Sequence, residues 1–246
     1  MSFETLDADT WALLKKYDTP TICNVWELLD VRPRTAGYMD RRITAAFPSL
    51  APMVGYASTA TFRSANPPRS GNVYAGLSAQ LKDFERYPGP AVVVFQDMDD
   101  PSAAATFGEI MCTTYKTFGA AGLITSGTGR DLDQVAAINF PVFTAGTVCA
   151  HGYCQVVDVG VPVHVGGISI QCGDIIHADR NGVTTIPTGA ARLVAQSCEE
   201  FMQAEAVILE YLKGAKPNIE GFSKAQEECK NRIKKLGEKM RKSFFG

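Results

Sequence analysis

The chain has 246 residues, 46% of them hydrophobic and 20% charged, with a formal net charge of −2 at pH 7. That composition supports one sizeable buried core and gives no overall charge that would attract nucleic acid or an anionic membrane surface. The first residues contain no apolar segment typical of a signal peptide, and no run approaches the roughly 18 to 20 apolar residues that span a bilayer. We therefore expect a cytoplasmic protein without membrane or nucleic-acid partners.

The cysteine and histidine patterns argue against a zinc site. The seven cysteines are scattered without a Cys-x-x-Cys pair, and the three histidines, His151, His164 and His177, lack the i, i+4 spacing of helical metal ligands. We expect reduced, mostly buried cysteines. Any metal would have to be held by oxygen ligands.

Two short helices are predicted near the amino terminus. Asp7 or Asp9 caps an amphipathic stretch over residues 7–17, which the Thr-Pro pair at 19 and 20 is expected to end. A second helix is predicted over residues 21–29. A loop rich in Arg, Pro and Gly follows it.

The middle of the chain alternates between strand and helix patterns. Residues 91–96 form a continuous apolar run, as expected of a parallel strand that is buried on both faces. Such alternation predicts a βαβαβ unit with right-handed crossovers. The predicted elements are, in order, a strand at 53–62, a helix at 71–86, a strand at 91–96, a helix at 108–119, a strand at 122–127, a helix at 131–139 and a strand at 141–146.

Beyond residue 155 the pattern changes to short strands separated by Gly and Pro without intervening helices. This pattern predicts an antiparallel layer stacked beside the parallel unit. A helix is then predicted over residues 188–212, with Thr188 as its cap. The apolar face of that helix is formed by Leu193, Val194, Phe201, Val207, Ile208 and Leu212.

The carboxyl-terminal segment is basic, with eight Lys or Arg and three Asp or Glu between Lys224 and Lys242. A basic helix of this kind can bind a membrane surface or RNA. We favour a solvated helix whose Ile233, Leu236 and Met240 pack on its own chain or on a neighbouring subunit.

Together these patterns predict an α/β fold with a βαβαβ parallel unit, a second layer of short strands and carboxyl-terminal helices. The predicted division is a core domain over residues 1–187, a core helix over residues 188–213 and a basic helical extension over residues 214–246.

Two polar loops are expected to meet at one edge of the parallel sheet, where the carboxyl ends of strands create ligand sites. One loop ends at Gly108-Glu109, and the other runs from Thr128 to Asp131. A helix of about ten residues carries the chain ~15 Å away, and a strand of about six residues returns it ~20 Å. Both loops therefore reach the same edge.

The residue types in these loops suit a metal-bound 2-oxo acid. Arg130 can grip a carboxylate with two parallel hydrogen bonds, and the backbone N–H groups of Glu109, Ile110 and Met111 at a helix start favour an anion. Asp131 and Glu109 supply oxygen ligands for Mg²⁺ or Mn²⁺. The alternative is structural: Arg130 and Asp131 form a surface salt bridge, and Glu109 complements its helix dipole.

Three features, in order along the chain, resemble the HMG/CHA aldolase family, also called RraA-like. Glu109 precedes Arg130-Asp131 with the 20-residue interval of the family's acidic-x20-Arg-Asp pattern. Residues 119–135 (GAAGLITSGTGRDLDQV) resemble its GxxGxxxxGxxRD segment, and residues 172–187 (CGDIIHADRNGVTTIP) resemble its GDxxxADxxGVxxxP segment. The resemblance runs from about Tyr87 to Pro187 and implies an RraA-like, swivelling β/β/α-type sandwich.

The resemblance implies a role for each matched residue. Asp131 would bind the divalent metal, Mg²⁺ or Mn²⁺, directly, and Arg130 would hold pyruvate. Glu109 would support the metal through water, and Glu109 and Ile110 would offer backbone N–H groups to the substrate. A neighbouring subunit's helical glutamate also reaches the family's site, and Glu205 is its match.

The implied activity is that of a class II, metal-dependent pyruvate aldolase. It would cleave a 4-hydroxy-2-oxo acid of the 4-hydroxy-4-methyl-2-oxoglutarate or 4-carboxy-4-hydroxy-2-oxoadipate type between C3 and C4, with a water near the metal as the base. A pyruvate enolate forms and is protonated at C3. Oxaloacetate decarboxylation passes through the same enolate and is expected at the same site.

Two positions depart from the family pattern. Asn24 stands where members often carry an acidic residue, and Ser126 stands where the first Asp of a DGxxRD segment is usual. Both bear on substrate preference. Asp174 and Asp179 are assigned structural roles in tight turns. His151 lies in a Gly-rich loop that could reach the active site, and we favour an ordinary loop position for it.

The family also implies an alternative function and an assembly. Some RraA proteins lack the full acidic and Arg-Asp set and bind RNase E as inhibitors, whereas this chain keeps Glu109, Arg130 and Asp131. The enzyme is therefore favoured over a regulator that binds RNase E or another protein. A methyltransferase is not supported, because the chain has no Gly-rich cofactor loop. Relatives are ring-like trimers, so a homotrimer or a hexamer is expected.

Overall fold

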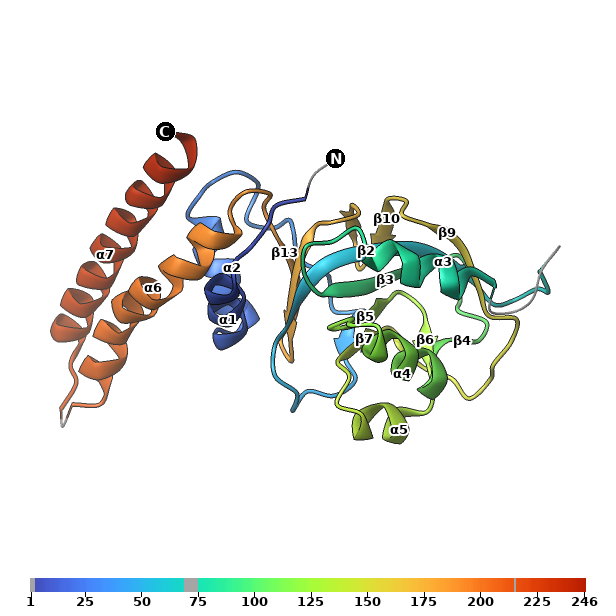
Figure 1. The fold of residues 1–246 in the computed structure, drawn as a ribbon. Coiled ribbons are helices and arrows are strands. Elements are labelled where there is room, and N and C mark those ends of the chain that lie inside the picture. Colours follow the sequence, from blue (N-terminus) through green and yellow to red (C-terminus); the bar gives the residue numbers. More distant parts are fainter. Residues whose placement is uncertain (1–2, 69–74, 215) are drawn as a thin grey trace.

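The computed structural model describes residues 3–68, 75–214 and 216–246, and it confirms the predicted α/β fold (Figure 1). The elements of the described chain are, in order, α1 (Ala8–Lys16), α2 (Thr19–Glu27), β1 (Thr44–Ala45), β2 (Met53–Arg63), α3 (Ala75–Phe84), β3 (Ala91–Asp97), β4 (Ala105–Phe107), α4 (Glu109–Thr117), β5 (Gly122–Thr125), β6 (Thr128–Gly129), α5 (Leu132–Ala137), β7 (Val142–Thr144), β8 (Gly146–Thr147), β9 (Gln155–Val159), β10 (Val163–Val165), β11 (Ile168–Ile170), β12 (Ile175–Asp179), β13 (Gly182–Ile186), α6 (Ala191–Leu212) and α7 (Ile219–Phe245). The main sheet has the strand order β1-β7-β5-β3-β2-β12-β13, and β9 also pairs with β2.

The predicted parallel unit is present. β2, β3, β5 and β7 are parallel neighbours, and α3, α4 and α5 follow the first three of them in chain order. β3 is buried from Ala91 to Phe95, in keeping with a strand that is covered on both faces. α3 is described from Ala75 onward, and its predicted start at Gly71 lies outside the described residues.

Short antiparallel strands follow residue 155 as predicted, but most of them extend the main sheet. β12 pairs with β2, β13 pairs with β12, and β9 pairs with β2. The β10–β11 hairpin provides the second layer, because Val163, Val165 and Ile170 are buried in one cluster with Val92 and Val94 of β3. Alternating apolar and polar residues indicate a strand without specifying its partner, so the sequence did not distinguish the two placements.

A small parallel sheet, β4-β6-β8, was not predicted. Each of its strands comes after a parallel strand of the main sheet: β4 after β3, β6 after β5, and β8 after β7. Ala105 pairs with Thr128, and Thr128 pairs with Gly146. Strands of two or three residues are too short for hydrophobic periodicity to reveal.

The two amino-terminal helices are confirmed with one correction. Asp7 caps α1 by accepting a hydrogen bond from Thr10 N. The Thr-Pro pair at 19 and 20 begins α2, because Asp18 caps the new helix and the fixed φ of proline suits the first helical turn. Both helices contribute to the apolar cluster that joins the main sheet to α6.

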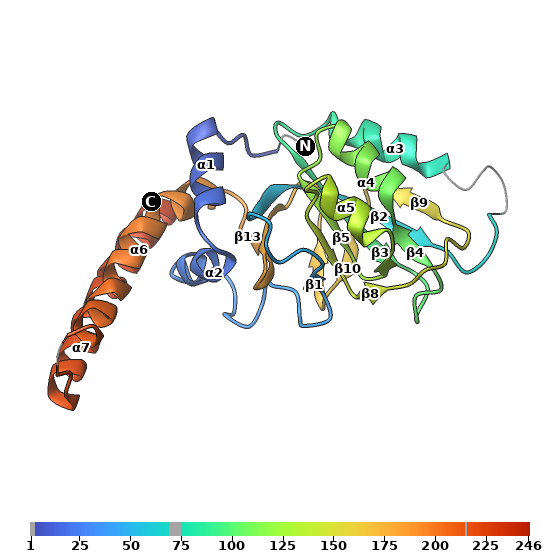
Figure 2. The same ribbon diagram turned by 90° about the horizontal axis from the view of Figure 1, so that it is seen from below.

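Helices α6 and α7 form a hairpin that projects from one end of the molecule (Figures 1 and 2). The prediction of Thr188 as the cap of α6 was wrong. The chain turns at Gly189, whose φ is +75°, and α6 begins at Ala191 without a side-chain cap. Phe201 is buried as predicted, whereas Leu212 at the far end of the helix is 48% exposed.

The basic helix α7 packs on its own chain, which is one of the two placements the sequence favoured. Leu236 and Met240 are buried, and Ile233 packs against the same apolar cluster. Its outer surface is solvated and carries ion pairs between neighbouring turns, such as Lys224 with Glu220. None of the helices in the described parts of the chain is long and apolar enough to cross a membrane.

Candidate active site

The small sheet brings together the two loops that the sequence singled out. β4 and β6 are parallel neighbours, and Arg130 N donates a hydrogen bond to Phe107 O at 3.2 Å. Helix α4 begins at Glu109, directly beyond β4, and α5 begins after Asp131, directly beyond β6. Glu109 and the Arg130-Asp131 pair therefore leave the same sheet edge side by side.

Two glycines permit this close approach. A Cβ atom at Gly129 would lie 1.9 Å from the ring of Phe107, and a Cβ atom at Gly108 would lie 2.6 Å from Oδ2 of Asp131. The φ of Gly108 is −163°, an extended conformation that any residue adopts. The site thus requires the absence of a side chain at Gly108, and not an unusual backbone.

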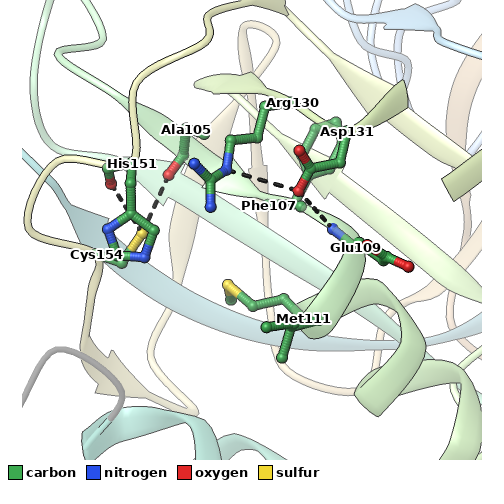
Figure 3. A pocket seen from close by; sticks show the side chains of 10 residues that line it. Ala105, Phe107, Glu109, Met111, Arg130, Asp131, His151 and Cys154 are labelled. Atoms are coloured by element: carbon green, nitrogen blue, oxygen red, sulfur yellow. Dashed lines mark hydrogen bonds and ion pairs between the residues drawn. The ribbon is translucent and has the colours of Figure 1, made fainter. Parts of the chain in front are cut away.

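A pocket of about 100 Å³ opens between these segments (Figure 3). Water occupies ~30 Å³ per molecule in the liquid, so the pocket suits a ligand of only a few heavy atoms or one end of a larger ligand. All the residues predicted for the site from these two loops border it. The lining residues are Ala105, Phe107, Gly108, Glu109, Ile110, Met111, Arg130, Asp131, His151 and Cys154.

Asp131 is held from two sides. Its Oδ2 accepts a hydrogen bond from Glu109 N at 3.0 Å and lies 3.7 Å from Nε of Arg130. Its backbone is left-handed, with φ 57° and ψ 41°, a conformation that Asp adopts more readily than most residues. The side chains of Arg130 and Asp131 are 33% and 34% exposed, so both charges face the open pocket. The predicted salt bridge therefore exists within the pocket itself.

The amino terminus of α4 faces the same pocket. A backbone hydrogen bond at the start of the helix runs from Cys112 N to Gly108 O at 3.0 Å, so the N–H groups of Ile110 and Met111 precede the intrahelical ladder. The partial positive charge of a helix start adds to these donors. This end of the pocket favours an anion such as a carboxylate.

His151 and Cys154 also line the pocket, although the favoured prediction assigned His151 to an ordinary loop and no role was predicted for Cys154. Cys154 Sγ donates to the carbonyl oxygens of Ala105 and His151 at 3.4 and 3.3 Å, and burial raises the pKa of its thiol. Both residues follow β8, the third strand of the small sheet. The pattern that could have revealed them is the recurrence of a polar loop after every parallel strand.

Two other predicted residues lie far from the pocket within one chain. Glu205 is on α6, in the projecting hairpin, and the pocket borders β4 and β6 at the opposite end of the molecule (Figures 1 and 2). Burial raises the pKa of the Glu205 carboxyl. Asn24 is exposed on α2, near the hairpin. A contribution of Glu205 to a neighbouring subunit's site remains a prediction.

Ser126 lies outside the pocket. Its Oγ accepts a hydrogen bond from Asp97 N at 2.9 Å, and it borders a separate cavity of about 560 Å³ together with Asp97 and His164. Asp174 and Asp179 hold turns, as predicted. Oδ2 of Asp174 accepts from Gln171 N at 2.8 Å, and Oδ1 of Asp179 accepts from Asn181 N at 2.8 Å.

The donor set fits a hydrated Mg²⁺ or Mn²⁺ better than zinc. Among the described residues, no group of three or more His, Cys, Asp or Glu could enclose a metal ion. Mg²⁺ keeps several waters and needs only one or two protein carboxylates. Oδ2 of Asp131 is engaged by Glu109 and Arg130, whereas no described residue donates a hydrogen bond to Oδ1. Oδ1 is thus available to a hydrated ion.

Comparison with known proteins identifies the family. A family model described as RraA-like (Aldolase/RraA) matches residues 19–185. The chain belongs to the RraA-like family. The matched range contains both polar loops and ends within β13, so the hairpin of α6 and α7 lies outside it.

Two curated relatives carry the name "Putative 4-hydroxy-4-methyl-2-oxoglutarate aldolase". The protein from Halalkalibacterium halodurans is 34% identical to this RraA-like chain over 132 residues, which are 53% of this chain and 60% of the relative. The protein from Ectopseudomonas mendocina is 28% identical over 108 residues, 44% of this chain and 67% of the relative. The chain thus matches less than two thirds of the length of the first relative.

Solved structures share the fold over most of the chain. An uncharacterized protein from Pseudomonas syringae has a TM-score of 0.72 at 22% identity, covering 92% of this chain and 97% of the other. Streptomyces coelicolor RraAS2, described as an unusual member of the RNase ES inhibitor RraA protein family, has a TM-score of 0.64 at 25% identity, covering 83% of this chain and 97% of the other. The predicted RraA-like architecture is confirmed.

Proposed function

We propose that this RraA-like protein is a carbon–carbon lyase that cleaves a 4-hydroxy-2-oxo acid and releases pyruvate. The observation that carries the proposal is a single pocket bordered by the Arg130 guanidinium, the Asp131 carboxylate and the amino terminus of α4. The proposed substrates are of the 4-hydroxy-4-methyl-2-oxoglutarate or 4-carboxy-4-hydroxy-2-oxoadipate type. The names of the aldolase relatives support this class.

The residues of the pocket divide the work of binding and charge stabilisation. Arg130 binds the carboxylate of the 2-oxo acid end through its planar fork, and the N–H groups of Ile110 and Met111 add donors. When the C3–C4 bond breaks, its electron pair moves to C3 and gives the enolate of pyruvate, with negative charge on the C2 oxygen. Arg130 and the start of α4 both border the pocket, so in this proposal they stabilise the charge as it develops.

Asp131 is the residue proposed to hold a divalent metal, Mg²⁺ or Mn²⁺, with Glu109 supporting it through water. The bound ion would supply Lewis-acid polarisation of a carbonyl oxygen. The hydrogen bond from Glu109 N to Oδ2 keeps the Asp131 carboxylate oriented whether or not an ion is present. Oxaloacetate decarboxylation, which gives the same enolate, is the proposed side activity.

Pyruvate release from a panel of 4-hydroxy-2-oxo acids and from oxaloacetate tests the proposal. We expect turnover with Mg²⁺ or Mn²⁺, loss of turnover after treatment with EDTA, and recovery when either ion is added back. Full activity in metal-free buffer would contradict the metal dependence. No pyruvate from any member of the panel would contradict the lyase itself.

A regulatory function is the second candidate. The likeness to RraAS2, at 25% identity over most of both chains, favours it. In that case the pocket would be incidental, and binding to RNase E or another protein would occur without any requirement for Arg130 or Asp131. The Arg130-Asp131 pair and the donors that face it favour the enzyme.

The proposed enzyme is a homotrimer or a hexamer. The hairpin of α6 and α7 projects from the chain, so it can reach a second subunit (Figure 2). Glu205 on this hairpin would then complete a neighbouring pocket. Small-molecule substrates are the proposed ligands, with no role for nucleic acid or membrane.

A further inference from the structure

The pocket of the proposed active site is closed on one side and open on the other. Its closed side is formed by Phe107, Met111 and Cys154, which are at most 6% exposed and belong to one apolar cluster. Its open side includes the exposed residues Glu109 and Ile110, the second of which is 70% exposed. A bound ligand therefore has an apolar wall on its inner side and solvent beyond Ile110.

The apolar wall is held in place by its surroundings. Cys154 Sγ donates a hydrogen bond to Ala105 O at 3.4 Å, which fixes the direction of the thiol. The ring of Phe107 packs against the backbone of Gly129, where a Cβ atom would lie only 1.9 Å from the ring. Neither side chain can withdraw to make room for a larger ligand without disturbing the small sheet.

Met111 completes this wall and lies across the pocket from Arg130. It belongs to the first turn of α4, and Figure 3 shows its thioether below the Arg130 guanidinium, with the pocket between the two groups. Asp131 lies to one side of the guanidinium, with Oδ2 3.7 Å from Nε. Arg130, Asp131 and Met111 thus border the same small space from three directions.

The proposed binding mode directs C3 of the substrate at Met111. C2 of a 2-oxo acid is trigonal, so the carboxylate, the carbonyl oxygen and C3 spread from it in one plane. With the carboxylate on Arg130 and the carbonyl oxygen toward Asp131, C3 takes the remaining direction, toward Met111. The C3–C4 bond breaks most readily when it is perpendicular to that plane, so C4 and its substituents leave the plane toward the open side.

We propose that Met111 restricts the enzyme to substrates without a substituent on C3, an inference that rests on the proposed function. The two hydrogens on C3 fit against the thioether. A methyl group in place of one of them would overlap with the thioether or force the carboxylate away from Arg130. Both proposed substrate types agree with this limit, because they are branched at C4 and unbranched at C3.

Hydrogen exchange at C3 of the product measures the limit. The last step of the proposed reaction protonates C3 of the bound enolate, so its reverse removes a proton from C3. In D₂O the C3–H bond breaks, the proton passes to water, and the electron pair forms the C2–C3 double bond as the carbonyl pair moves to oxygen. A deuteron then bonds to C3 and the carbonyl returns. Pyruvate and 2-oxobutanoate differ in this reaction only by the methyl group on C3.

The test follows this exchange by NMR with Mg²⁺ present and divides each rate by the rate in the same buffer without protein. We expect the unmodified protein to favour pyruvate over 2-oxobutanoate by at least about tenfold, as one methylene group does in a fitted pocket. Met111→Ala keeps the backbone N–H and should reduce this preference by roughly tenfold. Met111→Val removes less of the core and should shift the preference in the same direction.

Met53→Ala is the matched control. Met53 is a methionine of β2 that is 2% exposed, lies in a different apolar cluster and does not border the pocket. Its loss should weaken the core but leave the preference for pyruvate unchanged. The preference is a ratio measured on one sample, so it does not depend on how much of each variant is folded.

Three results would overturn the inference and leave the lyase standing: no preference in the unmodified protein, an unchanged preference in both Met111 variants, or an equal reduction in Met53→Ala. Absence of pyruvate exchange together with absence of pyruvate release from every 4-hydroxy-2-oxo acid would overturn the proposed function, and this inference with it.

Discussion

The carboxylate of Asp131 accepts a hydrogen bond from the backbone N–H of Glu109, 3.0 Å away and 22 positions earlier in the chain. This bond ties the loop after β6 to the start of α4. The residue proposed to hold the metal and the helix end proposed to hold the substrate carboxylate are thereby fixed relative to each other, before any ligand binds.

Asp131→Asn separates the charge of this residue from its structural role. Asparagine tolerates the left-handed backbone and keeps an oxygen that can accept from Glu109 N, but it is neutral. We expect metal-dependent pyruvate release to fall by at least ~100-fold, while the free energy of unfolding stays within about 0.5 kcal/mol. Steady-state assays measure pyruvate release, and urea denaturation measures the free energy of unfolding. A loss of activity that merely follows a loss of folded protein would assign Asp131 a structural role.

Arg130→Lys tests the planar grip on the substrate carboxylate. A lysine keeps the positive charge but cannot form two parallel hydrogen bonds. Loss of a charge-assisted hydrogen bond costs about 1.5 to 3 kcal/mol, so kcat/KM for the 4-hydroxy-2-oxo acid should fall by roughly 10- to 100-fold. Initial-rate kinetics give the ratio, and values within about twofold of the unmodified enzyme would contradict the proposed contact.

Gly108→Ala tests the space around the Asp131 carboxylate. The added methyl group would lie 2.6 Å from Oδ2, and the φ of −163° adds no backbone strain. The carboxylate must move, and small misplacements of catalytic groups lower rates by roughly 100-fold. We therefore expect a loss of that size in pyruvate release. Gly119→Ala is a control for alanine substitution in general, because nothing lies within 4 Å of its Cβ position, although its φ of +88° brings some strain. Similar activity of Gly108→Ala and the unmodified enzyme would show that the contact is unimportant.

The sequence located the main polar loops of the pocket because long-range geometry constrains them. The continuous apolar run at 91–96 and the second strand at 122–127 predicted a parallel unit, and parallel strands end at the same edge of a sheet. The interval between Glu109 and Arg130 then placed both loops at that edge. The structure brings the two loops together as expected, through the additional pairing of β4 with β6.

Short-range features escaped prediction for physical reasons. β4, β6 and β8 contain two or three residues each, too few for a periodic pattern. The left-handed backbone of Asp131 and the approach of His151 depend on contacts between segments that no local pattern encodes. The N-cap of α6 was misassigned because Thr188 has the right chemistry but precedes a turn at Gly189.

His177 should make stability depend on pH. The ring is fully buried, with Nδ1 2.9 Å from Thr19 Oγ1 and Nε2 2.9 Å from Leu14 O, and burial lowers its pKa below the ordinary value of 6.5 despite the opposing charges of Asp179 and Asp18. Below that value the unfolded chain binds a proton that the native state does not. The contribution of His177 to the free energy of unfolding is therefore complete above pH 6.5 and is lost as the pH falls below that value.

Urea denaturation at about pH 8 and about pH 5.5 measures this effect, with a lower free energy of unfolding expected at the lower pH. His177→Gln should be less stable at both pH values because it disturbs two buried hydrogen bonds. The difference between its free energies of unfolding at the two pH values should nevertheless be smaller than in the unmodified protein. An unchanged difference in the variant would assign the pH dependence to other groups.

The final prediction concerns assembly and Glu205. Light scattering during size-exclusion chromatography should give three or six times the chain mass of 26.5 kDa. If Glu205 of one subunit completes the pocket of another, Glu205→Gln and Asp131→Asn should each be impaired alone. Co-assembled in equal amounts, they should regain activity, because about a quarter of the sites then combine an intact Asp131 with an intact Glu205 from the neighbour. A fully active monomer, or mixed oligomers no more active than the two variants measured apart, would contradict the shared site.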